Sequence, residues 1–428
     1  MEIEKVIEGR AFVNGELRYA EIGINEGKIV TVGKLVSGGD ERIDIGSSRI
    51  ILPAFMDPHV HFRDPGMTQK ETFSTGTLSA IHAGVTCVLD MPNTKPPAVD
   101  VASLKEKKAT VRGKAYTDDG LFAAVTSSIN ARMLAPMVPG FKLFMGSTTG
   151  NILLNDDEEM IPAVTNALST GKRMSVHAED DSMILRETEN CTRDHLRDRP
   201  AKAEWNAISR LASHFKGQKI NICHLTTSEG LDLARAAGFT TEVTMHHMMF
   251  DVDRCPGAYY KVNPPIRTAD ARDALYRRFL AGDIDMIGTD HAPHTIEEKE
   301  QEFDAAPGGM PGIETTMPIL MNMVRSETVP LAQIVRMAAE NPGRNFSVPK
   351  GVIAPGYDAD FAVFDMRRSA PIDVRNLHSK CGHSVYGGFQ AVFPDTVIMR
   401  GEVQVQDAEF CGERSGVDVC GGLRSRLL

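Results

Sequence analysis

The sequence predicts an α/β protein in which a (β/α)8 barrel stands beside a small β-sandwich built from both ends of the chain. From Ile51 to about Gly312, short apolar runs rich in β-branched residues alternate with longer segments of helical period. Towards both ends, apolar and polar residues alternate around turn residues, as in antiparallel strands. We therefore expect a barrel over residues 50–346 and a sandwich over residues 1–49 and 347–428.

Eight apolar runs can be counted in the barrel region, and eight parallel strands close a barrel. The runs are IILPAF, VTCVLDM, GLFAAVT, FKLFMG, MSVHAE, INICHLT, TEVTMHH and IDMIGTD. A doubly wound open sheet with extra strands would show the same alternation, so the number of runs alone does not exclude that fold. We favour the barrel.

The predicted sandwich draws on both ends of the chain. Asn14-Gly15 and Glu26-Gly27 are hairpin signals in the first 49 residues. The segments GYDADFAVFDM and TVIMRGEVQVQDAEF show the same alternating pattern near the other end. Because chain ends commonly lie close together, we expect these strands to meet in one domain.

Composition narrows the class of protein. With 57 acidic against 47 basic residues and a net charge of -10, the chain has no electrostatic signature for nucleic acid or an anionic membrane surface. No apolar run approaches the roughly 20 residues that span a bilayer, and the N-terminus shows no targeting pattern. The seven cysteines are scattered without a C-x-x-C pair. We expect a cytoplasmic protein without disulfides.

Polar residues fall at or just beyond the C-terminal end of most apolar runs. In a parallel barrel this end carries the loops that build active sites. The residues, in chain order, are His59, His61, Arg63, Asn93, Lys142, His177, His224, Asn263, Asp290, His291 and His294. Histidine and aspartate side chains that converge from different strands are ligands for a borderline-soft cation such as zinc.

His59 and His61 are separated by one residue, so both imidazoles should point to the same side of the barrel mouth. For a His-x-His pair alone, two ordinary polar residues at a strand end would be the better interpretation. Here three further candidate ligands follow other strands, and we favour a metal site.

Lys142 shares a predicted strand face with Phe144 and should point into the barrel, where an unpaired ammonium is almost never tolerated. One solution is an ion pair, for instance with Asp290. The other is reaction of the neutral amine, which burial favours, with carbon dioxide to give a carbamate, a bidentate anionic oxygen ligand. We favour the carbamate because it can bridge two metal ions.

With this bridge, the candidate ligands divide into two sets. His59, His61 and Asp290 form one set, and His177 and His224 form the other. Two cations about 3.5–4 Å apart would then share a hydroxide. Neither set is a closed thiolate cage, so we expect a catalytic rather than a structural metal site.

Ten motifs in order resemble the cyclic amidohydrolases, and among them most closely the dihydroorotases of the long, barrel-plus-sandwich type. These motifs are DPHVHFRDPG, DMPNT, GFKLFMGS, SVHAED, ICHLT, KVNPPIR, GTDHAPH, PGGMPGIET, NPGRNF and IAPGYDADFAVFD. The resemblance covers nearly the whole chain. It implies the metal set above, with Asp290 as both ligand and general acid/base. It also implies a substrate site of His61, Arg63, Asn93, Asn263, His294, Gly308 and Gly309.

One departure concerns Lys142, since many bacterial relatives of the long type carry aspartate at this position, whereas others and the hydantoinases use a carboxylated lysine. The lysine in this chain fits the second group. The resemblance therefore does not carry over the metal count of the aspartate-bearing relatives.

Arg63 is the residue that distinguishes between the cyclic amidohydrolase activities that share these metal ligands. Dihydroorotate carries a carboxylate that the planar guanidinium can match with two donors, whereas dihydropyrimidines and allantoin lack this group. We expect reversible hydrolysis of (S)-dihydroorotate to N-carbamoyl-L-aspartate in pyrimidine biosynthesis. A hydantoinase, dihydropyrimidinase or allantoinase-like enzyme is the alternative. A structural ion pair of Arg63 with Asp57 or Asp64 stays open.

A catalytically silent scaffold for aspartate transcarbamoylase would be a function of a different class. A silent relative would be expected to lose metal ligands, and all of them are present, so this hypothesis ranks low. We expect a small-molecule substrate and a homo-oligomer, and association with aspartate transcarbamoylase stays open.

Several other residues are predicted to lie outside the catalytic set. His246 and His247 end an apolar run, where at most one of two adjacent strand side chains faces the site. Cys223 should point away from His224. The remaining histidines lie in helical or terminal segments without a convergent partner in the sequence, and we expect surface or satisfied core histidines; they are His82, His195, His214, His378 and His383. The glycine-rich segment 294–312 is predicted to be a functional loop, although its first half could be an ordinary flexible loop.

Overall fold

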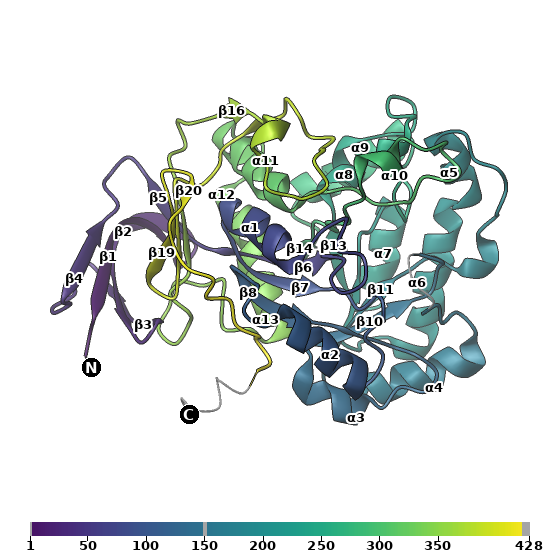
Figure 1. Ribbon diagram of the computed structural model, residues 1–428, viewed down its shortest axis with the longest axis horizontal. Helices are drawn as coiled ribbons and strands as arrows, with labels where there is room; N and C mark the ends of the chain where they lie inside the picture. Colours follow the sequence, from purple (N-terminus) through teal and green to yellow (C-terminus); the bar gives the residue numbers. More distant parts are fainter. Residues whose placement is uncertain (1, 149–151, 422–428) are drawn as a thin grey trace.

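The computed structural model describes residues 2–148 and 152–421. Within these residues, parallel strands form a barrel surrounded by helices, and a mixed sheet from both ends of the chain lies beside it (Figure 1). The predicted fold class is therefore confirmed.

The barrel strands are parallel and pair in chain order. Their bounds are β6 (Phe55–Val60), β7 (Val85–Asp90), β8 (Asp118–Leu121), β9 (Ala123–Ala124), β10 (Gly140–Phe144), β11 (Arg173–His177), β12 (Ile220–Ile222), β13 (Thr240–Val243) and β14 (Met286–Ile287). β8 pairs with β7 and β9 with β10, so these two pieces occupy one strand position, interrupted at Phe122. The ring closes where Val60 bridges His291, and the His61 N–H donates to the His291 carbonyl at 2.8 Å.

Helices cover the outside of the barrel (Figure 1). They are α1 (Phe73–His82), α2 (Val101–Val111), α3 (Ala131–Leu134), α4 (Asp157–Leu168), α5 (Thr192–Asp198), α6 (Ala201–Phe215), α7 (Ser228–Ala236), α8 (Met245–Met249), α9 (Ala269–Leu280), α10 (Ile296–Lys299), α11 (Ile313–Arg325), α12 (Leu331–Val335) and α13 (Asn341–Phe346). Side-chain oxygens of Thr72, Asp100 and Thr227 accept N–H groups at the starts of α1, α2 and α7, which satisfies donors that a helix leaves unpaired. In α6, Ala203, Ala207 and Leu211 are buried at helical spacing against the barrel.

The terminal sheet contains strands from both ends of the chain. They are β1 (Lys5–Val13), β2 (Glu16–Asn25), β3 (Lys28–Gly33), β4 (Glu41–Asp44), β5 (Ile50–Pro53), β15 (Phe361–Phe364), β18 (Thr396–Met399), β19 (Glu402–Gln406) and β20 (Glu409–Phe410). The predicted hairpins connect β1 with β2 and β2 with β3. The two ends meet where β5 pairs antiparallel with β15, and Ile22, Ile51 and Phe361 belong to the core of this domain.

Two sequence predictions about these regions are corrected. The run IILPAF is not one barrel strand, because Ile50–Pro53 is β5 of the terminal sheet and Phe55 begins β6. Every residue of both strands is buried, so their apolar pattern does not mark where one sheet ends. The terminal sheet thus extends past the boundary predicted at residue 49. In addition, the strands β16 (Ala370–Pro371) and β17 (Gln390–Ala391) form a separate pair, and β17 packs against α11 of the barrel.

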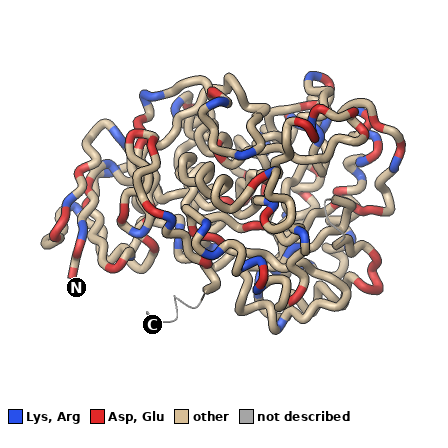
Figure 2. The backbone as a smooth tube through the Cα atoms, viewed as in Figure 1, with Lys and Arg blue, Asp and Glu red and all other residues tan. Residues whose placement is uncertain are grey.

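Charged residues of both signs are interspersed along the chain (Figure 2). No helix in the described ranges combines the length and apolarity that crossing a lipid bilayer requires.

Candidate active site

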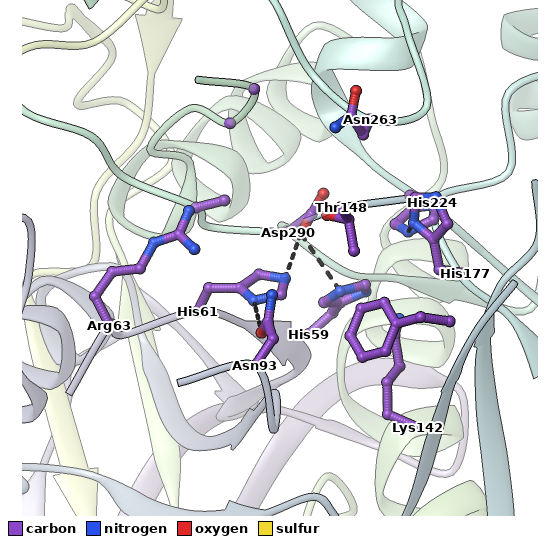
Figure 3. A pocket seen from close by; sticks show the side chains of 14 residues that line it. His59, His61, Arg63, Asn93, Lys142, Thr148, His177, His224, Asn263 and Asp290 are labelled. Carbon is purple, nitrogen blue, oxygen red and sulfur yellow. Dashed lines mark hydrogen bonds and ion pairs between the residues drawn. The ribbon is translucent and has the colours of Figure 1, made fainter. Parts of the chain in front are cut away.

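A pocket lies at the C-terminal ends of the barrel strands, and the predicted site residues gather around it (Figure 3). Its lining consists of His59, His61, Arg63, Asn93, Lys142, Phe144, Thr148, His177, His224, Asn263, Asp290, Ala292, Gly308 and Gly309. Of the residues predicted for metal or substrate, His294 is the one outside this lining, and it contacts Arg63 and Gly308 from behind. In this view Arg63 lies on one side of Asp290, and His177 and His224 lie on the other.

Four imidazoles present nitrogen atoms to the centre of the pocket. Asp290 Oδ1 lies 3.0 Å from His61 Nε2 and 3.4 Å from His59 Nε2. On the other side, His177 Nδ1 lies 3.0 Å from His224 Nε2. The strand ends and the turns that follow them therefore bring together side chains that lie more than two hundred residues apart in the chain.

The opposite nitrogen of three of these rings has its own partner. His59 Nδ1 lies 2.7 Å from Glu242, His61 Nδ1 lies 2.7 Å from the Asn93 side-chain oxygen, and His177 Nε2 lies 2.8 Å from Glu179. Acceptors of this kind fix the ring orientation and the tautomer of metal-binding histidines. Sequence analysis missed Glu179 and Glu242; the available signal was an acidic residue inside or directly after an apolar run.

Electrostatics keep Asp290 ionised. Burial acts to raise the pKa of Asp290, but the neighbouring His59 and His61 outweigh it and hold that pKa well below its ordinary range. Burial lowers the pKa of His61 to about 3, although Asp290 opposes this shift. Burial and Lys142 act to lower the pKa of His59, but Glu242 and Asp290 outweigh them and raise it to about 10. The Asp290 carboxylate and the neutral His61 are thus in the protonation states that bind cations, whereas His59 would release a proton on binding one.

Lys142 projects from β10 and is fully buried. Its amine lies 3.0 Å from Cys223 Sγ and 5.3 Å from the centre of the Phe144 ring. Among the residues that the structure describes, no carboxylate forms an ion pair with this amine, so the ion pair with Asp290, the alternative to the favoured carbamate, is not formed.

The prediction for Cys223 is corrected as well, because this side chain reaches the barrel interior. The regular strand β12 ends at Ile222, and His224 adopts a positive φ of 36°. The alternation of side chains along a strand therefore stops before Cys223, and both it and the next side chain face inward.

Two groups of side chains in the described ranges could each hold a metal ion. His59, His224 and Asp290 form one group, and His59, Cys223 and Glu242 form the other, with the ligand atoms of each within 4.8 Å of one another. Nitrogen, carboxylate oxygen and sulfur are the donors that zinc prefers. The residues present thus fit a metal ion.

His246 and His247 lie on α8 rather than on a strand, because β13 ends at Val243 and Thr244 caps the helix. Both side chains are buried outside the pocket lining. His247 lies between Thr244 Oγ1 at 2.7 Å and the Pro264 carbonyl at 2.9 Å.

Arg63 is held in place at the rim of the pocket. Its side chain is buried, and its Nε donates to the Pro293 carbonyl at 3.2 Å. The Lys70 ammonium lies 3.0 Å from His294 Nδ1, and His294 Nε2 lies 3.1 Å from both Arg63 Nη2 and the Gly308 carbonyl. Burial and the adjacent Arg63 and Lys70 lower the pKa of His294, which keeps this ring neutral. One side of the pocket is therefore cationic.

Asn263 faces the glycine-rich segment across the pocket. His195 Nε2 lies 2.8 Å from the Asn263 side-chain oxygen, and its Nδ1 lies 2.7 Å from Glu189, so His195 is a buried histidine with both nitrogens partnered, and one partner lines the pocket. A Cβ atom at Gly308 would lie 3.2 Å from Asn263 Nδ2. Gly309 has a φ of 141°, and a Cβ there would lie 2.5 Å from the Ala292 carbonyl. Only glycine fits at the second position.

His378 and His383 also have partners that the sequence did not reveal. His378 Nδ1 lies 2.6 Å from Glu314 at the start of α11, and His383 Nε2 lies 2.9 Å from the His294 carbonyl. The segment that carries them thus packs against the rim of the site.

Comparisons with known proteins agree with this geometry. A dihydroorotase from Methanosarcina mazei is 37% identical, with 92% of each chain covered. A dihydroorotase from Archaeoglobus fulgidus is 35% identical, with 95% of this chain and 98% of that one covered. Among solved structures, an L-hydantoinase (dihydropyrimidinase) from Arthrobacter aurescens has a TM-score of 0.90 at 24% identity, covering 97% of this chain and 99% of that chain, a likeness of fold. Residues 50–403 match the model of the amidohydrolase family. The chain belongs to the amidohydrolase family.

Proposed function

We propose that this protein is a dihydroorotase, which interconverts (S)-dihydroorotate and N-carbamoyl-L-aspartate in pyrimidine biosynthesis. The observation that carries the proposal is the buried guanidinium of Arg63, fixed beside Asp290 and the histidine cluster in one pocket. A carboxylate on the ring gives this cation its partner. The relatives named dihydroorotase, at 33 to 37% identity, support the same activity.

We infer that the site holds two zinc ions. The proposed ligands are His59, His61, His177, His224, Asp290 and a carboxylated Lys142. Support comes from the convergent nitrogen atoms and from the burial of the Lys142 amine without an acid partner in the described part of the chain. When bound, such ions polarise a carbonyl group and activate water at neutral pH.

In the proposed reaction, the side chains of this protein bind and orient the substrate and transfer the proton. Arg63 binds the substrate carboxylate through two N–H donors, and His61, Asn93, Asn263, His294 and the backbone of Gly308 and Gly309 orient the ring. Asp290 accepts the proton of the attacking water and returns it to the ring nitrogen as the amide bond breaks. In the reverse direction Asp290 takes a proton from the ureido nitrogen and gives it to the departing water.

A hydantoinase or dihydropyrimidinase is the second candidate, because the solved structures with the same fold carry these names. Their ring substrates lack the carboxylate that the cationic side of this pocket can bind. Arg63 therefore favours dihydroorotate over these rings and over allantoin.

The test uses the purified protein with its metal content measured by elemental analysis. Dihydroorotate, dihydrouracil, hydantoin and allantoin are supplied separately, and N-carbamoyl-L-aspartate is supplied for the reverse reaction. We expect turnover of dihydroorotate and N-carbamoyl-L-aspartate in preference to the uncharged rings. Faster turnover of hydantoin or dihydrouracil would contradict the assignment, and a metal-free, inactive protein would favour the scaffold hypothesis. Carbon-13 NMR after growth with labelled bicarbonate would detect the carbamate of Lys142.

We propose a reducing, cytoplasmic location, which the scattered positions of the seven cysteines, without a C-x-x-C pair, support. Assembly into a homo-oligomer and association with aspartate transcarbamoylase remain predictions. Light scattering of the protein alone and mixed with the transcarbamoylase would check them.

A further inference from the structure

Lys299, the last residue of α10, is buried and bonded to backbone rather than to an acid. One per cent of its surface is exposed. Its ammonium donates to the carbonyls of Pro307 and Gly309, each at 2.9 Å, and to that of Lys261 at 3.4 Å. Within the described residues, no carboxylate forms an ion pair with it. This is an unusual environment, since buried lysines normally pair with acids.

The three carbonyls belong to the two loops that carry substrate-facing groups. Lys261 precedes Asn263 by two residues, and Pro307 and Gly309 flank Gly308. The Gly309 N–H donates to the same Lys261 carbonyl at 2.8 Å. Asn263, Gly308 and Gly309 all line the pocket, whereas Lys299 lies behind it. A single ammonium therefore joins the backbones of two walls of the site.

A role in stability alone does not account for a lysine at this place. Burial, together with the adjacent Lys261 and Arg63, lowers the pKa of Lys299 to about 7, so the charged form is held at an electrostatic cost. A buried apolar side chain of similar length would avoid that cost. What the apolar side chain could not do is satisfy three carbonyls at once.

We propose that Lys299 is a positioning residue, which fixes the backbone around Lys261 against that of Pro307 and Gly309 so that Asn263, Gly308 and Gly309 form one substrate-binding surface. The inference rests on the proposed function for the identity of the substrate. It concerns binding rather than proton transfer, because Asp290 and the histidine cluster are contacted by other residues.

The test compares Lys299→Met, which removes all three N–H donors at similar length, with Lys299→Gln, which keeps two N–H donors on a shorter, uncharged side chain and guards against loss of the fold. Leu211→Ala is the matched control, because Leu211 is buried in α6 on the outside of the barrel. We expect both Lys299 variants to raise KM for dihydroorotate by roughly tenfold or more, with kcat within about threefold of the wild type. Amide hydrogen exchange should quicken in residues 258–264 and 303–311. The control should lower Tm and leave KM and these exchange rates unchanged.

An unchanged KM and unchanged exchange in folded Lys299 variants would overturn the proposal, as would a loss in kcat alone. If the wild type does not hydrolyse dihydroorotate, the proposed function fails. The exchange measurement needs no substrate, so it still decides whether Lys299 joins the two loops.

Discussion

Arg63→Ala removes the one pocket-lining cation proposed to bind the substrate carboxylate. The wild-type side chain is 3% exposed, and its Nε contacts the Pro293 carbonyl, so it already has a fixed orientation in the protein. Its backbone has a φ of 61°. Alanine keeps a Cβ, and the backbone strain at this position is therefore the same in both proteins.

The expected loss follows from the contacts that disappear. Two charge-assisted hydrogen bonds are worth roughly 1.5–3 kcal/mol each, so the total loss for dihydroorotate is about 3–6 kcal/mol. This corresponds to a fall in kcat/KM by about two to four powers of ten. Dihydrouracil has the same ring without the carboxylate, and its kcat/KM should change by no more than about fivefold, because neither bond exists for it.

The assay measures the hydrolysis of both rings by the wild type, by Arg63→Ala and by Arg254→Ala. Arg254 is a matched control, since its side chain is 66% exposed and pairs with Asp251 away from the pocket. The ratio of kcat/KM for the two rings should fall only in Arg63→Ala. Equal losses on both rings would mean that Arg63 supports the fold rather than the substrate carboxylate.

Three further predictions test the proton transfer by Asp290, the metal site and the buried carboxyl group of Asp119 in β8. Asp290→Asn should reduce kcat by at least about a hundredfold, since the amide cannot accept the proton, while circular dichroism stays unchanged; near-normal activity would exclude Asp290 as the base. Removal of metal with a chelator should abolish activity and lower Tm, and zinc should restore both; full activity after chelation would contradict the metal proposal. Burial, Asp418 and Asp118 raise the pKa of Asp119 to about 8, so the folded state binds a proton that the unfolded state releases between about pH 4 and pH 8. The stability of the wild type should therefore fall across this window relative to Asp119→Asn, by up to about 1.4 kcal/mol per pH unit, and parallel Tm profiles would refute this.

The sequence was enough to predict those site residues whose placement depends on their position along a strand. His59, His61, Lys142 and His177 follow from the ends of apolar runs, because the end of a strand is a local property of the chain. The same reasoning does not find Glu242 or Glu179. Their role depends on which imidazole lies opposite, and no local pattern distinguishes such a carboxylate from one at the surface.

Errors arose where regular structure ends earlier than the apolar run. Cys223 follows the last residue of β12, and His246 lies in a helix that begins two residues after β13. Alternation of side chains applies only within a strand, so the predicted direction of Cys223 was wrong. The prediction that His246 and His247 lie outside the catalytic set agrees with their burial away from the pocket lining, although they lie on a helix rather than on a strand. His195 contacts Asn263 although the two are far apart in the sequence, a proximity that only the closed barrel creates.

The pairing of β5 with β15 has a consequence for synthesis of the protein. Ile51 is translated about three hundred residues before its partner Val363, which at usual ribosomal rates is a delay of roughly fifteen seconds to a minute. During that time the whole barrel emerges while one edge of β5 has no neighbour. Exposed strand edges invite pairing with other chains, so the nascent protein is most vulnerable to aggregation just before β15 appears.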